Sequence, residues 1–313
     1  QGNVISPLDV MKQSGADILR LWVASSDTSD DIRLSQDSLT RLSEGYRKIR
    51  NTFRFLMGNL SGFDPAKDSL EYRQLLEVDR WALSKLEALK QEVTSAYESY
   101  QMHRVYHLVY NFCVTEMSSF YLDVLKDRLY TDARQSILGR SARTALYEIL
   151  SVLNRILAPI LSFTCEEVWA CLGKTSSVHL EDWPKPNVEY RRVDLEEKWQ
   201  HFMSIRDQVL KAIEEKREKK EIGNSLEASV ELAFFKKEDF DFLKIFEEDL
   251  PSLLLVSHVG LEAELLPPAG ETAMSVTVSK APGAKCERCW NYRGSVGKDR
   301  EHPALCGRCL KVV

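Results

Sequence analysis

The sequence predicts a mainly α-helical protein, in which an antiparallel bundle of long helices precedes a small α+β module and a C-terminal ribbon built around four cysteines. Three observations lead to this fold class. Apolar residues recur at steps of three and four over several long segments between residues 36 and 175. Short β-rich runs appear after residue 184. Two Cys-x-x-Cys pairs lie near the end of the chain.

Length and composition are those of a globular protein. The chain has 313 residues, of which 44% are hydrophobic and 28% charged, enough for two or three domains. It begins at Gln1 with neither an initiator Met nor a leader, so we expect a fragment of a longer protein. The most apolar window, residues 145–163, is interrupted by polar residues, which predicts a soluble protein without a membrane span. The seven cysteines do not form a disulfide-framework pattern, which favours the reducing cytoplasm.

Charge is distributed unevenly along the chain. Residues 280–313 contain three acidic and eight basic residues and carry +5, so the rest of a chain of net charge -5 carries -10. A basic C-terminal segment is compatible with an anionic partner even though the whole chain is acidic. The basic residues are Lys280, Lys285, Arg288, Arg293, Lys298, Arg300, Arg308 and Lys311.

Two short helices are predicted at the N-terminal end. Residues 6–9 combine a Ser N-cap, a Pro at the first helical position and an acid in the first turn. Residues 14–17 repeat the Ser-x-x-Asp pattern, which predicts a second helix that ends near Trp22. Residues 25–31 are too rich in Ser and Asp to continue a helix, so we expect a loop there.

The helical bundle is predicted within residues 37–183. An apolar stripe from Leu39 to Leu60 predicts a long amphipathic helix, which Gly62 and Pro65 end. Further helices are expected at 78–100, 105–130 and 141–157, and Thr164 is the expected N-cap of a short helix that ends at Gly173.

A small α+β module is predicted within residues 184–279. Two prolines within residues 183–186 exclude regular structure and indicate a linker. A long helix is expected at 195–220 and a shorter one at 240–248. Strands are expected at 228–235, 253–259 and 274–279.

Cysteine spacing predicts a metal centre within residues 280–313. Sixteen residues separate the Cys286–Cys289 pair from the Cys306–Cys309 pair, a spacing typical of one tetrahedral zinc ion. Four thiolates complete the coordination shell, which favours a structural zinc and leaves His302 a bystander. The alternatives are free or disulfide-bonded cysteines in a disordered tail, and a redox Cys-x-x-Cys, for which the sequence lacks the βαβ context.

Cations and aromatic rings surround the first cysteine pair. Arg288, Trp290, Tyr292 and Arg293 offer phosphate contacts and π-faces for stacking on unpaired bases. The alternative for either aromatic residue is a place in the small core of the ribbon. The basic residues are harder to explain in that way, because the ribbon keeps a positive charge when four thiolates hold one zinc ion.

A second basic feature lies on the first long helix. Arg47, Arg50 and Arg54 fall at i, i+3 and i+7 beside the apolar stripe, which predicts a positive patch that binds phosphates. An ordinary solvated helix face is the alternative, and it is the interpretation we give to the mixed charges of residues 211–221. No catalytic motif is present, so we predict no catalytic residues, and His103 and His107 lack a third metal ligand nearby.

Several segments resemble the class I aminoacyl-tRNA synthetases, in particular the bacterial-type isoleucyl-tRNA synthetases. Residues 1–7 and 16–22 are similar to the segment that follows the KMSKS loop in this class. The most discriminating match is the terminal four-cysteine ribbon with its Cys-Glu-Arg-Cys-Trp run. Other matching segments are 25–27, 31–33, 46–52, 122–130 and 157–160.

The resemblance implies a function for each part of the chain. Residues 1–36 resemble a stem-contact region, 37–183 the anticodon-binding domain, 184–279 a junction module and 280–313 a zinc ribbon. The family's enzyme attaches isoleucine to its tRNA with ATP, as a cytoplasmic protein that we expect to be a monomer. The HIGH motif, KMSKS residues and editing domain are absent, so this chain alone is not expected to form the aminoacyl-adenylate.

Two other interpretations remain open. The chain could be the corresponding part of a valyl or leucyl enzyme, although these relatives usually lack the ribbon. It could instead be a helical scaffold whose zinc ribbon binds a protein partner. A steep salt dependence of RNA affinity would oppose the second interpretation, because phosphate neutralisation releases counterions.

Overall fold

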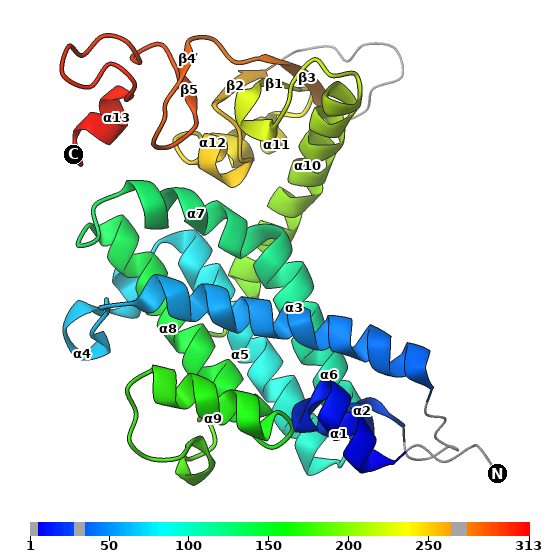
Figure 1. Ribbon diagram of the computed structural model, residues 1–313. Helices are drawn as coiled ribbons and strands as arrows, with labels where there is room; N and C mark the ends of the chain where they lie inside the picture. Colours follow the sequence, from blue (N-terminus) through cyan, green and yellow to red (C-terminus); the bar gives the residue numbers. More distant parts are fainter. Residues whose placement is uncertain (1–5, 28–34, 264–273) are drawn as a thin grey trace. The chain divides into compact units, whose positions relative to one another are not determined.

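The computed structural model describes residues 6–27, 35–263 and 274–313. The chain divides into two compact units, and each is considered by itself (Figure 1). The first unit consists of residues 1–122 and 137–196, and the second of residues 123–136 and 197–313. The predicted segments 1–5 and 28–34, including the Asp31–Arg33 match, lie outside the described residues.

The N-terminal helices form where the sequence predicts them, but their boundary differs. Helix α1 spans Pro7–Ser14, and α2 spans Ala16–Ser25, beyond the predicted end at Trp22. The predicted Ser14 cap is wrong, because Ser14 is the last residue of α1 and Gly15 precedes α2. Gly15 has φ +87°, a conformation open to glycine at little cost, so a sharp turn replaces a capped start.

Long helices dominate the first unit and confirm the predicted mainly α-helical fold. Helix α5 packs against both α8 and α6, and α3 packs against α8 (Figure 1). Their facing sides are fully buried, as Phe53, Leu83 and Leu146 illustrate. The other helices of the first unit are α3 (Gln36–Leu60), α4 (Pro65–Asp68), η1 (Tyr72–Gln74), α5 (Glu77–Glu98), α6 (Met102–Asn111), η2 (Phe112–Tyr121), α8 (Ile137–Leu157), α9 (Ser162–Cys171) and η3 (Val178–Leu180). Helix α7 (Leu122–Thr131) follows η2 and belongs to the second unit from residue 123 onward.

The predicted helix at 105–130 is continuous but not uniformly α-helical. Its middle third, η2, is a π-helix, and the residues at both junctions, Phe112 and Leu122, keep right-handed helical dihedral angles. Apolar periodicity did not predict the π-helix. A π-helical turn changes the backbone hydrogen-bond pattern, whereas the set of buried residues changes less.

A side chain from α2 caps α9. Asp17 accepts hydrogen bonds from the backbone N–H of Thr164 at 2.7 Å and from its hydroxyl at 2.6 Å. The predicted role of Thr164 as N-cap is therefore wrong, since α9 begins at Ser162 and Thr164 lies in its first turn. The buried carboxylate of Asp17 accepts hydrogen bonds from free N–H groups at the start of α9. Asp17, although distant in the sequence, therefore replaces a local N-cap.

The predicted linker at 183–186 is irregular and is hydrogen-bonded to α5. Trp183 donates its indole N–H to Thr94 at 2.9 Å, and Lys90 donates to the carbonyl oxygen of Lys185 at 2.6 Å. Lys90 also pairs with Glu87, and both side chains are almost fully buried. The proline-rich segment thus belongs to the packed structure of the first unit.

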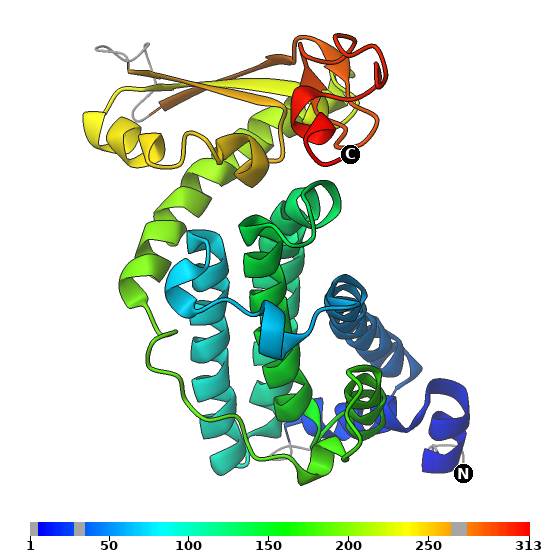
Figure 2. The ribbon, with the colours of Figure 1, turned by 90° about the vertical axis from the view of Figure 1, so that its left-hand side faces the viewer.

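The second unit contains a three-stranded sheet in the order β2–β1–β3. Strand β1 (Ala228–Phe234) pairs in parallel with β2 (His258–Ala263) and antiparallel with β3 (Met274–Lys280). Figure 2 shows α10 (Val193–Glu218), α11 (Lys237–Lys244) and α12 (Leu250–Leu253) on one side of this sheet. Trp199, Phe202 and Phe246 form the aromatic core beneath it, with ring centroids 5.3 to 5.5 Å apart. Turn η4 (Ser225–Glu227) leads into β1.

The predicted strand at 253–259 is wrong. Its apolar residues belong to α12 and the turn after it, where Leu253, Leu254 and Val256 are buried. Pro251 favours the start of a helix, and Leu255 has φ +57°, which interrupts an extended chain. A short apolar run cannot by itself distinguish a strand from a buried helix, and pairing begins only at His258.

Candidate metal centre and nucleic-acid interface

The four cysteines of the ribbon converge on one point. Cys286 and Cys289 lie in the turn between β4 (Ala284–Lys285) and β5 (Tyr292–Arg293), and Cys306 and Cys309 lie at α13 (Gly307–Leu310). All four side chains are buried, and their sulfur atoms lie within 4.8 Å of one another. The hairpin and the helical turn therefore each supply two donors to one small volume.

The geometry of the sulfur atoms fits a tetrahedral zinc ion. Zn–S bonds of about 2.3 Å place the sulfurs of a tetrahedral site about 3.8 Å apart. The sulfurs of Cys289 and Cys306 are 3.7 Å apart, which is also too far for a disulfide. His302 does not belong to the cluster, in agreement with its predicted role as a bystander. Bound zinc supplies the charge that holds the thiolates together and fixes the fold of the ribbon.

Backbone N–H groups favour the thiolate form of one cysteine of this centre, Cys286. Burial raises the pKa of Cys286, but N–H groups of Cys289, Cys306 and Arg288 outweigh it and lower the pKa to about 6. Cys306 donates its N–H to the sulfur of Cys286 at 3.3 Å. At Cys309, burial and the neighbouring thiolate of Cys289 raise the pKa. Four thiolates this close require a cation to coexist.

The aromatic residues of the ribbon have different environments. Trp290 is 60% exposed and takes no part in the small core around the cysteines, where Val296 and Leu305 pack. The Nζ atom of Lys285 lies 5.3 Å from the centre of a Trp290 ring. Tyr292 is half-buried, and its backbone N–H donates to the hydroxyl of Ser257 at 2.7 Å. Trp290 is thus the more exposed of the two rings.

The basic residues around the metal centre differ in their hydrogen bonds and ion pairs. Arg288 is half-buried and donates to the carbonyl oxygen of Cys309 at 3.4 Å. Arg293 is half-buried on β5. Arg308 was not predicted as a site residue, yet it makes the closest ion pair of the ribbon, with Asp127. No sequence pattern relates these two residues, which are 181 positions apart.

A cleft of about 640 Å³ lies in the second unit beside the first cysteine pair. Trp290, Arg288 and Lys285 line it from the ribbon, and Lys126 lines it from α7. Leu255 also lines the cleft, so two residues with left-handed backbone angles, Leu255 and Trp290, meet there. Residues held in sparsely populated conformations tend to cluster at functional sites. The sequence predictions did not include Lys126 and Leu255, and they counted Lys285 only among the basic residues of the C-terminal segment.

The predicted arginine patch lies on α3, in the first unit. Arg47, Arg50 and Arg54 are all exposed. Within the described part of the chain, none of them makes an ion pair. Their neighbour Lys48 instead donates to the Tyr110 hydroxyl at 3.0 Å, and this hydrogen bond raises the pKa of Lys48.

Comparison with known families matches most of the chain. Residues 79–232 match the anticodon-binding domain of tRNA ligase, and residues 1–35 match the tRNA synthetases class I (I, L, M and V). Residues 283–312 match a zinc finger found in FPG and IleRS. Isoleucine–tRNA ligases of Syntrophotalea carbinolica and Desulforamulus reducens are 50% and 48% identical over the whole chain. The chain belongs to the isoleucine–tRNA ligase family.

The isoleucine–tRNA ligase match covers only part of each relative. The chain spans 34% of the length of both relatives, in their C-terminal part. A solved leucyl enzyme from Agrobacterium radiobacter K84, in a ternary complex with tRNA, shares 21% identity over 61% of this chain and 22% of its own, with a TM-score of 0.45.

Family membership and geometry agree on the metal of this isoleucine–tRNA ligase segment. The zinc-finger match covers all four clustered cysteines, so the predicted single structural zinc is confirmed. Of the helices in the described ranges, none has both the length and the apolar character that crossing a bilayer requires.

Proposed function

We propose that this chain is the tRNA-binding part of an isoleucine–tRNA ligase, the ATP-dependent enzyme that attaches isoleucine to its tRNA. The anticodon-binding match over residues 79–232 is the observation that carries the proposal. The catalytic step belongs to the rest of the enzyme, and we propose a cytoplasmic monomer. A valyl or leucyl assignment has less support, because the two relatives named above, which match the whole chain, are isoleucine enzymes.

In this proposal two surfaces contact the tRNA. Arg47, Arg50 and Arg54 neutralise phosphates, since they are exposed cations without an ion-pair partner in the described part of the chain. The ribbon adds Arg288 and Arg293 for phosphates, and Trp290 and Tyr292 for stacking on unpaired bases. The exposure of Trp290 supports its role more strongly than the half-buried position of Tyr292 supports that of Tyr292.

The proposed boundaries of the four parts are 1–36, 37–183, 184–279 and 280–313. Two of these parts, 37–183 and 184–279, are divided between the compact units, because residues 123–136 pack with the second unit and residues 184–196 with the first. Function and packing therefore need not divide the chain at the same residues.

Binding of the purified chain to an isoleucine tRNA transcript tests the proposal. A transcript with an altered anticodon is compared at two salt concentrations, with and without a zinc chelator. We expect tighter binding to the correct anticodon, and weaker binding at high salt because counterions are released. Equal and negligible binding to both transcripts would contradict the proposal and favour the protein-binding scaffold.

A further inference from the structure

Arg308 occupies an unusual place in the metal centre. It is one of the two residues between Cys306 and Cys309, so the backbone on both sides of it is fixed by buried zinc ligands. Helix α13 is a single turn, and ligand binding at its two cysteines determines the direction in which the Arg308 side chain leaves the ribbon.

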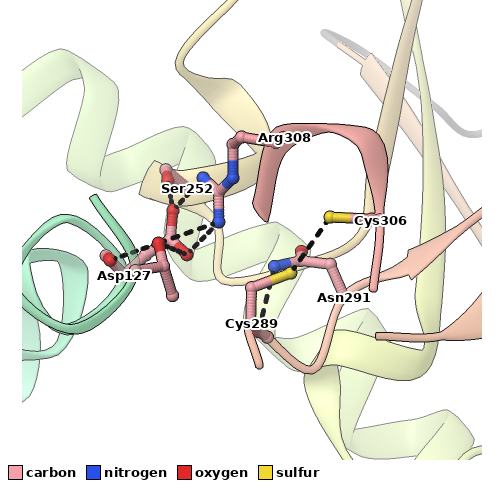
Figure 3. Close-up of polar contacts among 7 residues, drawn as sticks. Asp127, Ser252, Cys289, Asn291, Cys306 and Arg308 are labelled. Carbon is pink, nitrogen blue, oxygen red and sulfur yellow. Dashed lines mark hydrogen bonds and ion pairs between the residues drawn. The ribbon is translucent and has the colours of Figure 1, made fainter. Parts of the chain in front are cut away.

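The partner of Arg308 is Asp127 on α7, within the second unit (Figure 3). The Nη1 and Nη2 atoms of Arg308 lie 2.5 Å and 2.6 Å from the two carboxylate oxygens of Asp127. Nη2 also donates to the Thr131 hydroxyl at 3.1 Å, and Ser252 donates to Asp127 at 3.3 Å. Bidentate arginine–carboxylate pairs fix relative orientation as well as distance.

The Asp127 side chain is only 18% exposed, so this docking pair of Arg308 and Asp127 is partly shielded from solvent. Both Nη atoms are engaged by acceptors of the protein. A phosphate would have to displace Asp127 to bind them. Arg300, by contrast, is an exposed arginine of the same ribbon without an ion-pair partner in the described residues.

The docking pair lies at the cleft beside Trp290. Asp127, Thr131 and Ser252 all line that cleft, as does Trp290. A ribbon that moved away from α7 would separate Trp290 and Lys285 from Lys126 on α7, which lines the same cleft. The cleft therefore depends on how firmly the ribbon is held to residues 123–131.

We propose that Arg308 is a positioning residue, which through Asp127 fixes the zinc ribbon against residues 123–131 and so sets the RNA-binding cleft without contacting RNA itself. The part of this proposal that concerns RNA affinity rests on the proposed function. Zinc binding then acts on RNA affinity through the orientation of Arg308, in addition to folding the ribbon.

Replacement of Asp127 separates positioning from direct contact. Removal of an acidic residue beside an RNA-binding surface strengthens RNA binding if only charge matters. Loss of the docking pair weakens it instead. For Asp127→Ala, the charge explanation therefore predicts tighter RNA binding and the positioning explanation predicts weaker RNA binding. Arg308→Ala weakens RNA binding under both explanations.

The experiment measures affinity of the full chain for the isoleucine tRNA transcript over a salt series. We expect Asp127→Ala and Arg308→Ala each to weaken binding about tenfold, with the double variant no weaker than either single one. The slope of log affinity against log salt should stay unchanged in these variants, because no phosphate contact is lost. The reversed pair, Asp127→Arg with Arg308→Asp, should recover part of the affinity. Arg300→Ala controls for the loss of one ribbon charge.

Two further measurements do not depend on RNA. Zinc content should remain one ion per chain in each variant, and amide hydrogen exchange of residues 123–131 should become faster. If the variants exchange faster than the wild type at residues 123–131 but the wild-type chain binds no RNA, the docking pair is supported and only the proposed function is contradicted. Unchanged exchange, unchanged or tighter RNA binding by Asp127→Ala, or loss of zinc from Arg308→Ala would overturn the positioning role.

Discussion

Trp290 combines two properties that rarely occur together. Its backbone has φ +64°, in the left-handed region that disfavours a bulky side chain, and its ring is 60% exposed. Neither property stabilises the ribbon, since an exposed ring buries little area and the backbone conformation costs about 1 kcal/mol or more. A tryptophan at this position therefore points to a role in binding.

Replacement of Trp290 by Gly should separate stability from binding. We expect Trp290→Gly to leave the thermal stability of the zinc-loaded chain unchanged or higher, because Gly tolerates positive φ. RNA affinity should fall by about 1–3 kcal/mol, the usual contribution of one base stacked on an aromatic ring. Thermal unfolding and fluorescence anisotropy with the tRNA transcript measure the two effects.

Trp290→Phe serves as the matched control, because it keeps an aromatic face. Trp290→Phe should retain most of the RNA affinity. Its thermal stability should not rise, because Phe, unlike Gly, is disfavoured at positive φ. Equal affinities for the wild type, the Gly variant and the Phe variant would contradict stacking on Trp290.

At the scale of elements, helix α3 presents three exposed arginines, Arg47, Arg50 and Arg54, along one side. We expect the triple variant Arg47→Ala, Arg50→Ala and Arg54→Ala to weaken RNA binding and to reduce the slope of log affinity against log salt by about 2 if all three contact phosphates. Helix content should not change, because the three side chains are exposed and Ala is a good helix former.

A matched control removes the same charge elsewhere. Lys211, Lys219 and Lys237 are exposed residues outside α3, and their replacement by Ala also removes three positive charges. This control should leave the salt slope nearly unchanged. An equal decrease in both triple variants would show that net charge, rather than the α3 patch, determines affinity.

The Glu87–Lys90 pair on α5 holds the linker at residues 183–187. Lys90 Nζ lies 2.5 Å from Glu87, whose second oxygen accepts the N–H of Asn187 at 3.1 Å. We expect Lys90→Ala to lower the free energy of unfolding by about 3–5 kcal/mol, because it leaves a buried carboxylate without its partner.

Urea denaturation followed by circular dichroism measures this loss. The double variant Glu87→Gln with Lys90→Met should recover most of it, because Gln keeps an acceptor for Asn187 and no buried charge remains. A double variant as unstable as Lys90→Ala would attribute the effect to packing of the lysine chain.

At the scale of the whole molecule, we expect the first unit and the zinc ribbon to differ in their dependence on zinc. The first unit has an apolar core of long helices, whereas the ribbon core consists of four cysteines with only Val296 and Leu305 packed against them. We expect a chelator to unfold the ribbon and to leave most of the helical circular dichroism intact.

Zinc release measured with a chromophoric chelator should accompany this local change. Hydrogen exchange should become faster in residues 284–312 and remain slow in α5 and α8. Cooperative loss of all helical signal on chelation would contradict the independence of the first unit from the metal.

The sequence by itself determined the features that depend on neighbours along the chain. Apolar periodicity predicted α3, α5 and α8, because a helix that buries one side repeats its apolar residues every three or four positions. Cysteine spacing predicted the zinc centre, because two Cys-x-x-Cys turns already place four sulfurs for one metal.

Only the tertiary structure decided the features that join distant residues. Asp17 caps α9 across 147 positions, and Asp127 meets Arg308 across 181. Of the apolar run at 253–259, Leu253 ends α12, a turn follows, and only His258 and Val259 pair with β1 as the start of β2. Residues 123–136 pack with the second unit although they continue a helix of the first. Such outcomes depend on which surfaces meet in the folded chain. The sequence around one residue does not indicate a partner that lies far along the chain.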